Sequence, residues 1–168
     1  PLCEEQLRGC RFNLMDVVLH ADAIHRGMGQ LMPTSRRVIF SSMLSAEAGL
    51  LEPVFLANIS VPQDAMGNVY GVLTRRRGHV FSEDQKPGTP QITLLAYLPV
   101  LESFGFTADL RSHTGGKAFP QMTFDHWEPM SGSPHDAGTK CNEVVNTVRK
   151  RKGLKDGVPE LSQYLDKL

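Results

Sequence analysis

Paired cysteines, long apolar runs and an excess of one charge are all missing from this sequence of 168 residues. The three cysteines, Cys3, Cys10 and Cys141, form no CxxC pair and no Cys/His spacing typical of a metal site. This unpatterned, odd set indicates reduced thiols in a cytoplasmic protein. No segment approaches the roughly 20 apolar residues of a membrane helix, so we expect no membrane partner.

Charge is balanced, because Lys and Arg together number 18, as do Asp and Glu. A nucleic-acid partner would therefore have to bind local basic patches rather than an overall positive field. Such patches occur at residues 36–37, 75–77 and 149–152. Each patch alone is typical of a solvated helix end, whereas the three together favour contacts with phosphate groups.

The motifs of common enzyme classes are also absent. No GxxxxGK[ST] loop and no GxGxxG between a strand and a helix is present, which excludes a recognisable nucleotide-binding loop. HExxH is missing, and His20 and His25 have no recognisable third ligand, so the spacing predicts neither a metal site nor a hydrolytic site. We therefore expect this chain to be non-catalytic and to hold no cofactor.

Three elements are expected in the first part of the chain. Residues 11–20, RFNLMDVVLH, predict a strand because apolar residues alternate and Val and Leu are frequent. Residues 21–33 predict a glycine-containing loop. Thr34 or Ser35 can then cap a helix over 34–47, because a side-chain oxygen accepts a free backbone N–H there.

One histidine of that loop, His25, is flanked by Arg26, Gly27 and Gly29. Glycine permits unusual backbone angles and exposes its neighbours, which makes a core position for this imidazole unfavourable. An exposed imidazole beside a guanidinium can stack on RNA bases and attract phosphates. Spacing alone leaves this hypothesis open beside an exposed loop histidine without a function.

A second region repeats a pattern of strands and helices. Alternating apolar residues predict strands at 54–61, 79–83, 91–100 and 119–127. Helices are expected after Pro62 and around 103–113. The order β-α-β-β-α-β is that of a ferredoxin-like sandwich, with two helices on one face of a four-stranded antiparallel sheet.

The segment FGF at 104–106 is similar to the aromatic strand of RNA-recognition domains. It lacks the basic start and the aromatic end of that motif, and it follows the third strand, where a helix is expected. We therefore expect Phe104 and Phe106 to pack in the core. After this region a Pro/Gly/Ser-rich linker at 128–140 leads to a helix near 141–151 and a short final helical turn.

Four long strings resemble the elongation factor 2 family of eukaryotic and archaeal translocation GTPases: LHADAIHRGMGQLMPTSRR, YGVLTRRRGHVFSEDQKPGTP, AYLPVLESFGFTADLRSHTGGKAFPQMTFDHW and RKRKGLKDGVPELSQYLDKL. The resemblance implies an α+β protein: the C-terminal part of an α/β arm domain, a ferredoxin-like βαββαβ sandwich and a short helical tail. Residues 1–52 would be the C-terminal part of domain IV with its tip loop. Residues 53–130 would be domain V, and residues 131–168 a linker and helical tail packing back on domain IV. Because the chain does not begin with methionine, we expect its true start to lie upstream.

The resemblance also implies roles for single residues. His25 corresponds to the histidine that the family modifies to diphthamide, which makes diphthamide-forming enzymes and ADP-ribosylating toxins expected partners. The tip loop expected to contact tRNA and mRNA in the decoding centre comprises Asp22, His25, Arg26, Gly27 and Gly29. Expected contacts with ribosomal RNA are Arg36, Arg37, Arg75, Arg76 and Arg77. GTP and Mg would belong to an N-terminal G domain outside this chain.

The expected function is that of the ribosome-contacting part of a factor that promotes GTP-dependent translocation of tRNA and mRNA in translation elongation. One position departs from the family pattern, because Met28 replaces the middle one of three glycines and restricts the loop backbone. Two alternatives remain open: a stand-alone ferredoxin-like RNA-binding or interaction module, and the tail of the related spliceosomal GTPase. The strings ADAIHRG and AFPQMTFDHW favour the translation factor over the latter.

Overall fold

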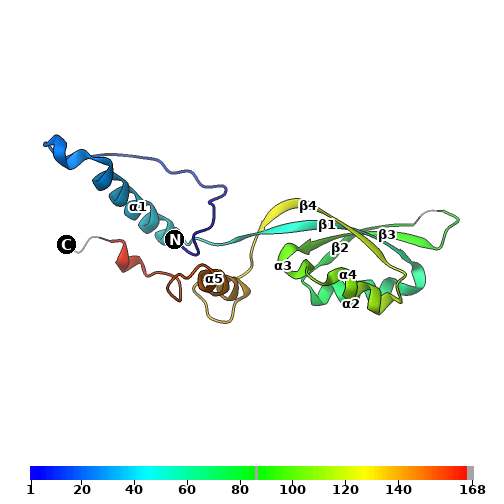
Figure 1. Cartoon of the computed structure of the whole chain (residues 1–168). Coiled ribbons are helices and arrows are strands. Elements are labelled where there is room, and N and C mark those ends of the chain that lie inside the picture. The colour runs from blue at the N-terminus through cyan, green and yellow to red at the C-terminus, as the bar shows by residue number, and fades with distance from the viewer. Residues whose placement is uncertain (86, 166–168) are drawn as a thin grey trace. The chain divides into compact units, whose positions relative to one another are not determined.

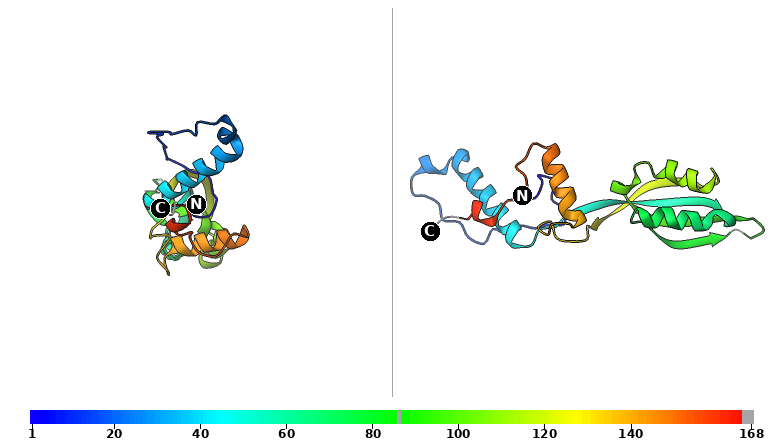
Figure 2. Two further views of the ribbon diagram at one scale, coloured as in Figure 1. Left: turned by 90° about the vertical axis from the view of Figure 1, so that its left-hand side faces the viewer. Right: turned by 90° about the horizontal axis from the view of Figure 1, so that it is seen from below.

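The computed structural model describes residues 1–85 and 87–165, so the last residues of the expected tail lie outside the described part. The chain divides into two compact units. Unit 1 comprises Pro1–Leu50 and Met130–Leu168, and unit 2 comprises Leu51–Pro129 (Figures 1 and 2). Within the described residues, no helix has both the length and the apolar character needed to cross a bilayer.

Unit 2 is a four-stranded antiparallel sheet with helices on one face (Figure 1). The elements of this unit are, in chain order, β1 (Leu51–Pro62), η2 (Gln63–Ala65), α2 (Met66–Arg75), β2 (His79–Gln85), β3 (Gln91–Pro99), α3 (Val100–Ser103), α4 (Phe106–Thr114) and β4 (Phe119–Pro129). The strand order is β2-β3-β1-β4, so β1 and β3 are central. This arrangement confirms the predicted α+β, ferredoxin-like fold.

The core of unit 2 lies between the sheet and the two longer helices. Alternate residues of the central strands are fully or almost fully buried: Ala57, Ile59, Val61, Ile92, Leu94, Ala96 and Leu98. The helices contribute Val69, Val72, Leu73, Phe106 and Leu110. Burying each larger aliphatic side chain contributes about 1.5–3 kcal/mol, so this shared core holds the helices on the sheet.

The prediction for FGF is right for one phenylalanine and wrong for the other. Phe106 is fully buried in the first turn of α4, whereas Phe104 is 77% exposed. Gly105 between them has a φ of 73°, a left-handed conformation that favours glycine. This turn interrupts the single helix expected at 103–113 and directs only one of the two rings into the core.

Unit 1 has its core where the C-terminal end of α1 (Met28–Ser45), the first residues of the chain and α5 (Lys140–Arg151) meet. This core contains Leu2, Cys3, Leu44, Ala48, Leu50, Val145, Val148 and Val158. Burial raises the pKa of the Cys3 thiol, which therefore stays protonated at neutral pH. None of the three cysteines, all of which lie in the described part of the chain, forms a disulfide.

A buried guanidinium joins the two ends of unit 1. Arg149 of α5 donates from Nη1 to the carbonyl oxygen of Leu2 at 2.6 Å and from Nε to that of Lys155 at 2.7 Å. Its neighbour Lys152 donates from Nζ to the carbonyl oxygens of Cys3 and Glu4. Part of the basic patch at 149–152 therefore stabilises unit 1.

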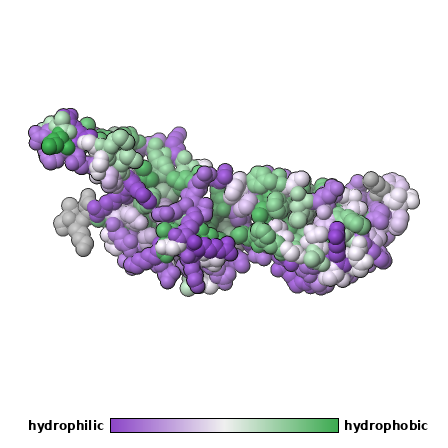
Figure 3. Space-filling view, in the orientation of Figure 1, coloured by the Kyte–Doolittle hydropathy of each residue, from purple (hydrophilic) through white to green (hydrophobic). Residues whose placement is uncertain are grey.

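The strand predicted at residues 11–20 is wrong, because this segment has no regular secondary structure. A strand requires a neighbour that accepts and donates its backbone hydrogen bonds. Among the described residues, no strand pairs with this segment. Its apolar side chains are consequently exposed, including Leu14, Met15 and Val18, and Figure 3 shows apolar patches at the surface of this unit.

Helix α1 begins at Met28, so the start predicted at Thr34 or Ser35 is wrong. Gly27 is the N-cap: its carbonyl accepts from the Gln30 amide at 3.0 Å, and its amide donates to Gln30 Oε1 at 3.3 Å. Thr34 lies inside the helix, where its hydroxyl donates to the Gln30 carbonyl at 2.9 Å. This early cap extends the helix back to the histidine-bearing loop.

We predict that Gly78→Ala destabilises unit 2. A Cβ at this position would lie 3.0 Å from the carbonyl oxygen of Tyr97 and 3.1 Å from Leu73 Cδ2, so these neighbours must move by a few tenths of an ångström. The expected loss in free energy of unfolding is about 1–3 kcal/mol. Gly71→Ala in α2 is the matched control, since nothing lies within 4 Å of its Cβ, and it should stabilise by up to about 1 kcal/mol. Urea unfolding followed by circular dichroism measures both, and equal stability of the two variants would contradict the tight packing.

Candidate functional site

The segment that carries His25 forms one turn of 3-10 helix, η1 (Ala23–Arg26), directly before α1. The His25 amide donates to the Asp22 carbonyl oxygen at 3.2 Å and closes this turn. η1 contains no buried residue, and it lies at the end of α1 that is remote from α5 (Figure 1). The structure thus places the histidine on a short exposed turn at the start of an 18-residue helix.

The side chains of this turn are open to solvent. The His25 ring lies edge-on to the His20 ring, with 4.5 Å between the ring centroids. Arg26 donates from Nη2 to the carbonyl oxygen of Ala21 at 3.3 Å. Both His25 and Arg26 are exposed, so an imidazole and a guanidinium are available for stacking and for contacts with phosphate.

The two glycines of the predicted tip loop do not use left-handed backbone. Gly27 has φ −71° and ψ 158°, an extended conformation, and Gly29 lies within α1. Met28 is the first helical residue, and it is 74% exposed. Since any L-residue adopts this backbone, methionine fits here without strain.

Asp22, predicted as a residue of the tip loop, also lies beside the two histidines as a third candidate ligand, which the sequence did not predict. The Asp22 amide donates to His20 Nδ1 at 3.0 Å, and Asp22 Oδ2 lies 3.7 Å from the same nitrogen. One candidate ligand atom from each of His20, Asp22 and His25 lies within 4.8 Å of the other two. The spacing of Asp22 and His25, three residues apart, was the available signal, because a 3-10 turn brings such residues onto one side.

The two arginines predicted in α1 make different contacts. Arg36 Nη2 lies 3.5 Å from Glu4 Oε1, and its guanidinium lies over the Phe40 ring, 5.0 Å from the centroid. Arg37 donates to the carbonyl oxygens of Tyr164 and Leu165 at 3.0 and 2.7 Å. Arg37 therefore fastens the end of the described tail to α1, whereas Arg36 remains on the surface with a side chain that is 65% exposed.

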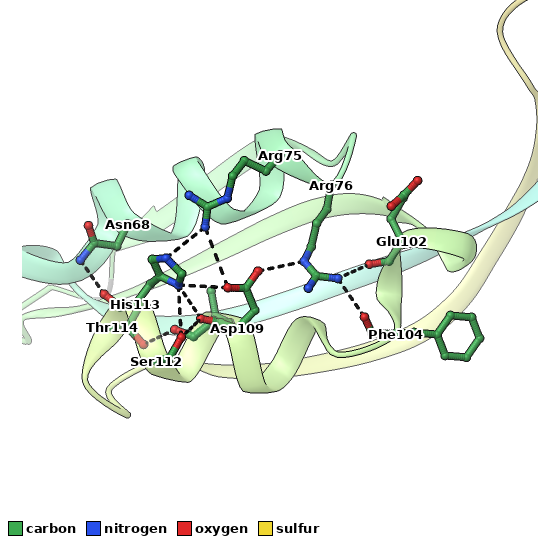
Figure 4. Close-up of polar contacts among 10 residues, drawn as sticks. Asn68, Arg75, Arg76, Glu102, Phe104, Asp109, Ser112, His113 and Thr114 are labelled. Atoms are coloured by element: carbon green, nitrogen blue, oxygen red, sulfur yellow. Dashed lines mark hydrogen bonds and ion pairs between the residues drawn. The ribbon is translucent and has the colours of Figure 1, made fainter. Parts of the chain in front are cut away.

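The arginines at the end of α2 are engaged within unit 2 (Figure 4). Arg76 donates from Nε to Asp109 Oδ2 at 3.1 Å and from Nη1 to the carbonyl oxygens of Glu102 and Phe104 at 2.7 and 2.9 Å. Arg75 Nη2 lies 3.2 Å from His113 Nε2, with a side chain that is 56% exposed. Arg76 therefore joins α2 to α3 and α4, while the side chain of Arg75 is more exposed to solvent.

Arg77 forms a bidentate pair with a buried carboxylate. Its Nη1 and Nη2 donate to Glu52 Oε1 and Oε2 at 2.8 and 2.9 Å, and its Nε donates to Glu102 Oε1 at 3.3 Å. The hydrogen bond with Glu52 is the main reason that the pKa of Arg77 is raised. This pair joins the end of α2 to the start of β1.

Two stretches of the chain match known family models. Residues 49–137 match elongation factor G C-terminus, and residues 1–47 match elongation factor G, domain IV. The chain belongs to the elongation factor G family. The domain IV match covers η1 and α1, and the C-terminus match covers all of unit 2. Membership of the elongation factor G family supports a role in translocation during translation elongation, with the ribosome as partner.

We predict that Glu52→Gln weakens unit 2 of this elongation factor G relative. The change removes the carboxylate that compensates the Arg77 guanidinium, whose side chain is only 30% exposed. The expected loss in free energy of unfolding is roughly 1–3 kcal/mol. Asp64→Asn is the control, because the Asp64–Lys117 pair is solvent-exposed and its loss should lower stability much less than Glu52→Gln does. Urea unfolding tests both, and an unchanged midpoint for Glu52→Gln would refute the role of the pair.

A second prediction concerns the stability of unit 2 at low pH. The hydrogen bond from Arg76 is the largest cause of the lowered pKa of Asp109, whose ordinary value is 3.8. Because the folded-state pKa is below the unfolded one, this carboxylate stabilises the fold above pH 3.8 and the contribution is lost as the pH falls further. Asp109→Asn should therefore be less stable than the parent at neutral pH, with a gap that narrows as the pH falls below 3.8. Thermal melting across a pH series measures the gap, and a gap that is independent of pH would contradict the assignment.

Proposed function

We propose that this chain is the ribosome-contacting C-terminal part of an elongation factor 2, the eukaryotic and archaeal member of the translocation GTPases. In the cytoplasm this factor would promote the GTP-dependent movement of tRNA and mRNA. The observation that carries the proposal is the exposed His25 on η1, next to Arg26 and directly before α1. The resemblance of ADAIHRG to the family's modified loop supports the assignment to elongation factor 2.

The proposed mechanism is mechanical. A tip that advances into the decoding centre must resist deformation, so its functional side chain has to be held by rigid elements. η1 is closed by a hydrogen bond and continues into α1, and the C-terminal end of α1 contributes Leu44 to the core of unit 1. His25 would contact the codon–anticodon helix, and Arg26 would attract phosphates.

Modification would extend the reach of this tip. Diphthamide on His25 would add a cationic group and further hydrogen-bonding atoms, and the exposed ring gives the diphthamide-forming enzymes and ADP-ribosylating toxins access. Met28 should not prevent this modification, since its backbone is helical and its side chain points into solvent.

Unit 2 would act as a rigid body against ribosomal RNA and protein. Of the three arginines at the end of α2, Arg75 is the strongest candidate for a phosphate contact, because its side chain is the most exposed. GTP and Mg would be bound by an N-terminal G domain. The gene should therefore encode an upstream phosphate-binding loop, and its absence would favour a stand-alone RNA-binding module.

We predict that His25 carries diphthamide in protein purified from eukaryotic cells. Cleavage after Arg11 and Arg26 yields peptide 12–26, which contains both His20 and His25. Fragmentation mass spectrometry should assign an added mass to His25, while His20 serves as the internal unmodified control. Met28→Gly, which restores the glycine run, should be modified to the same extent. An unmodified His25 in protein from its native eukaryotic cell would overturn the proposal, and protein made in bacteria provides the unmodified reference.

A further inference from the structure

We propose that His20, Asp22 and His25 together form a binding site for a divalent first-row transition ion of the Zn²⁺ type. The three side chains lie on and next to η1 in unit 1, and their candidate ligand atoms lie within 4.8 Å of one another. Among the described residues, these three side chains are close enough together to hold one metal ion.

The donor atoms select the class of ion. Two imidazole nitrogens and one carboxylate oxygen are the ligands of many Zn²⁺ sites with three protein ligands, in which water takes the fourth position. Imidazole also suits Ni²⁺, Co²⁺ and Cu²⁺, whereas Mg²⁺ and Ca²⁺ prefer oxygen ligands alone. The cluster therefore fits a borderline transition ion and not a hard cation.

The geometry requires only local movement. Bonds of about 2.0–2.2 Å in a tetrahedral site place ligand atoms about 3.4 Å apart. His20 Nδ1 and Asp22 Oδ2 are already 3.7 Å apart, and the two imidazole rings have centroids 4.5 Å apart. Because all three side chains are exposed, rotation about their side-chain bonds can close the remaining distance without disturbing a core.

The local hydrogen bonds prepare one ligand. The Asp22 amide donates to His20 Nδ1 at 3.0 Å, so this nitrogen acts as an acceptor through its lone pair. A neutral imidazole nitrogen with a free lone pair is the form that binds a metal ion. The ion would replace the amide as the partner of this nitrogen, or would use Nε2 after a change of tautomer.

Asp22 and Arg26 carry the charges on and next to this turn. Asp22 supplies one negative charge, which offsets part of the charge of a divalent ion. The nearby guanidinium of Arg26 donates to the carbonyl oxygen of Ala21, on the chain segment between two of the ligands. A bound ion would link His20, before η1, to His25, within it, and would fix the orientation of the His25 ring.

The test uses the whole 168-residue chain, produced in bacteria without a histidine tag. Zn²⁺ is titrated into the protein in competition with a chromogenic chelator, and Co²⁺ is used to read the coordination from visible absorption. One equivalent of Zn²⁺ should bind saturably. His20→Ala and His25→Ala should each weaken Zn²⁺ binding at least about tenfold and abolish the Co²⁺ bands, and Asp22→Asn should weaken binding similarly.

His135→Ala is the matched control, because it removes an exposed histidine of the same unit away from η1. Binding by this variant should equal that of the parent, and circular dichroism melting should show all four variants folded. The absence of saturable binding, or binding that survives both His20→Ala and His25→Ala, would overturn the proposal. Such a result would leave the proposed elongation role intact, since that role is tested by a covalent group on His25 in eukaryotic protein.

Discussion

The small core at the C-terminal end of α1 is the constraint on which the exposed part of unit 1 depends. Leu2, Cys3 and Val145 are buried there, and Leu44 of α1 packs against them. No residue of η1 or α1 is itself fully buried, so the position of the turn relies on packing at the opposite end of the helix. The turn that carries His25 is therefore exposed to solvent and is supported by the 18-residue helix that follows it.

Unit 2 is held together by apolar packing and by charged side-chain contacts. Its central strands are buried on the face that the helices cover, and charged contacts fasten the helix ends. Arg76 and Arg77 make these contacts, which explains why a run of three arginines does not amount to three free phosphate-binding groups. A basic residue at a helix end is therefore a candidate for a nucleic-acid contact only if acceptors within the protein do not already occupy its side chain.

The sheet could be predicted from the sequence because every second residue of its central strands is apolar and these residues face the core. In β3 these residues are Ile92, Leu94, Ala96 and Leu98. The exposed position of His25 followed from its glycine and arginine neighbours. Residues 11–20 also alternate, but alternation does not say whether a partner strand is present, and here none is described. Phe104 and the start of α1 were mispredicted because each depends on the conformation of one glycine, Gly105 or Gly27. The closeness of Asp22 to both His20 and His25 was not predicted, because it arises only once the 3-10 turn has formed.

The buried Arg149, whose guanidinium binds the carbonyl oxygen of Leu2, has a consequence for the order of synthesis. Unit 1 is assembled from two stretches with all of unit 2 between them. During translation, residues 51–129 leave the ribosome as one uninterrupted segment and can fold at once, whereas the first 50 residues must wait for α5. Until α5 (Lys140–Arg151) has been synthesised, the apolar side chains of residues 1–50 that pack against it therefore remain exposed.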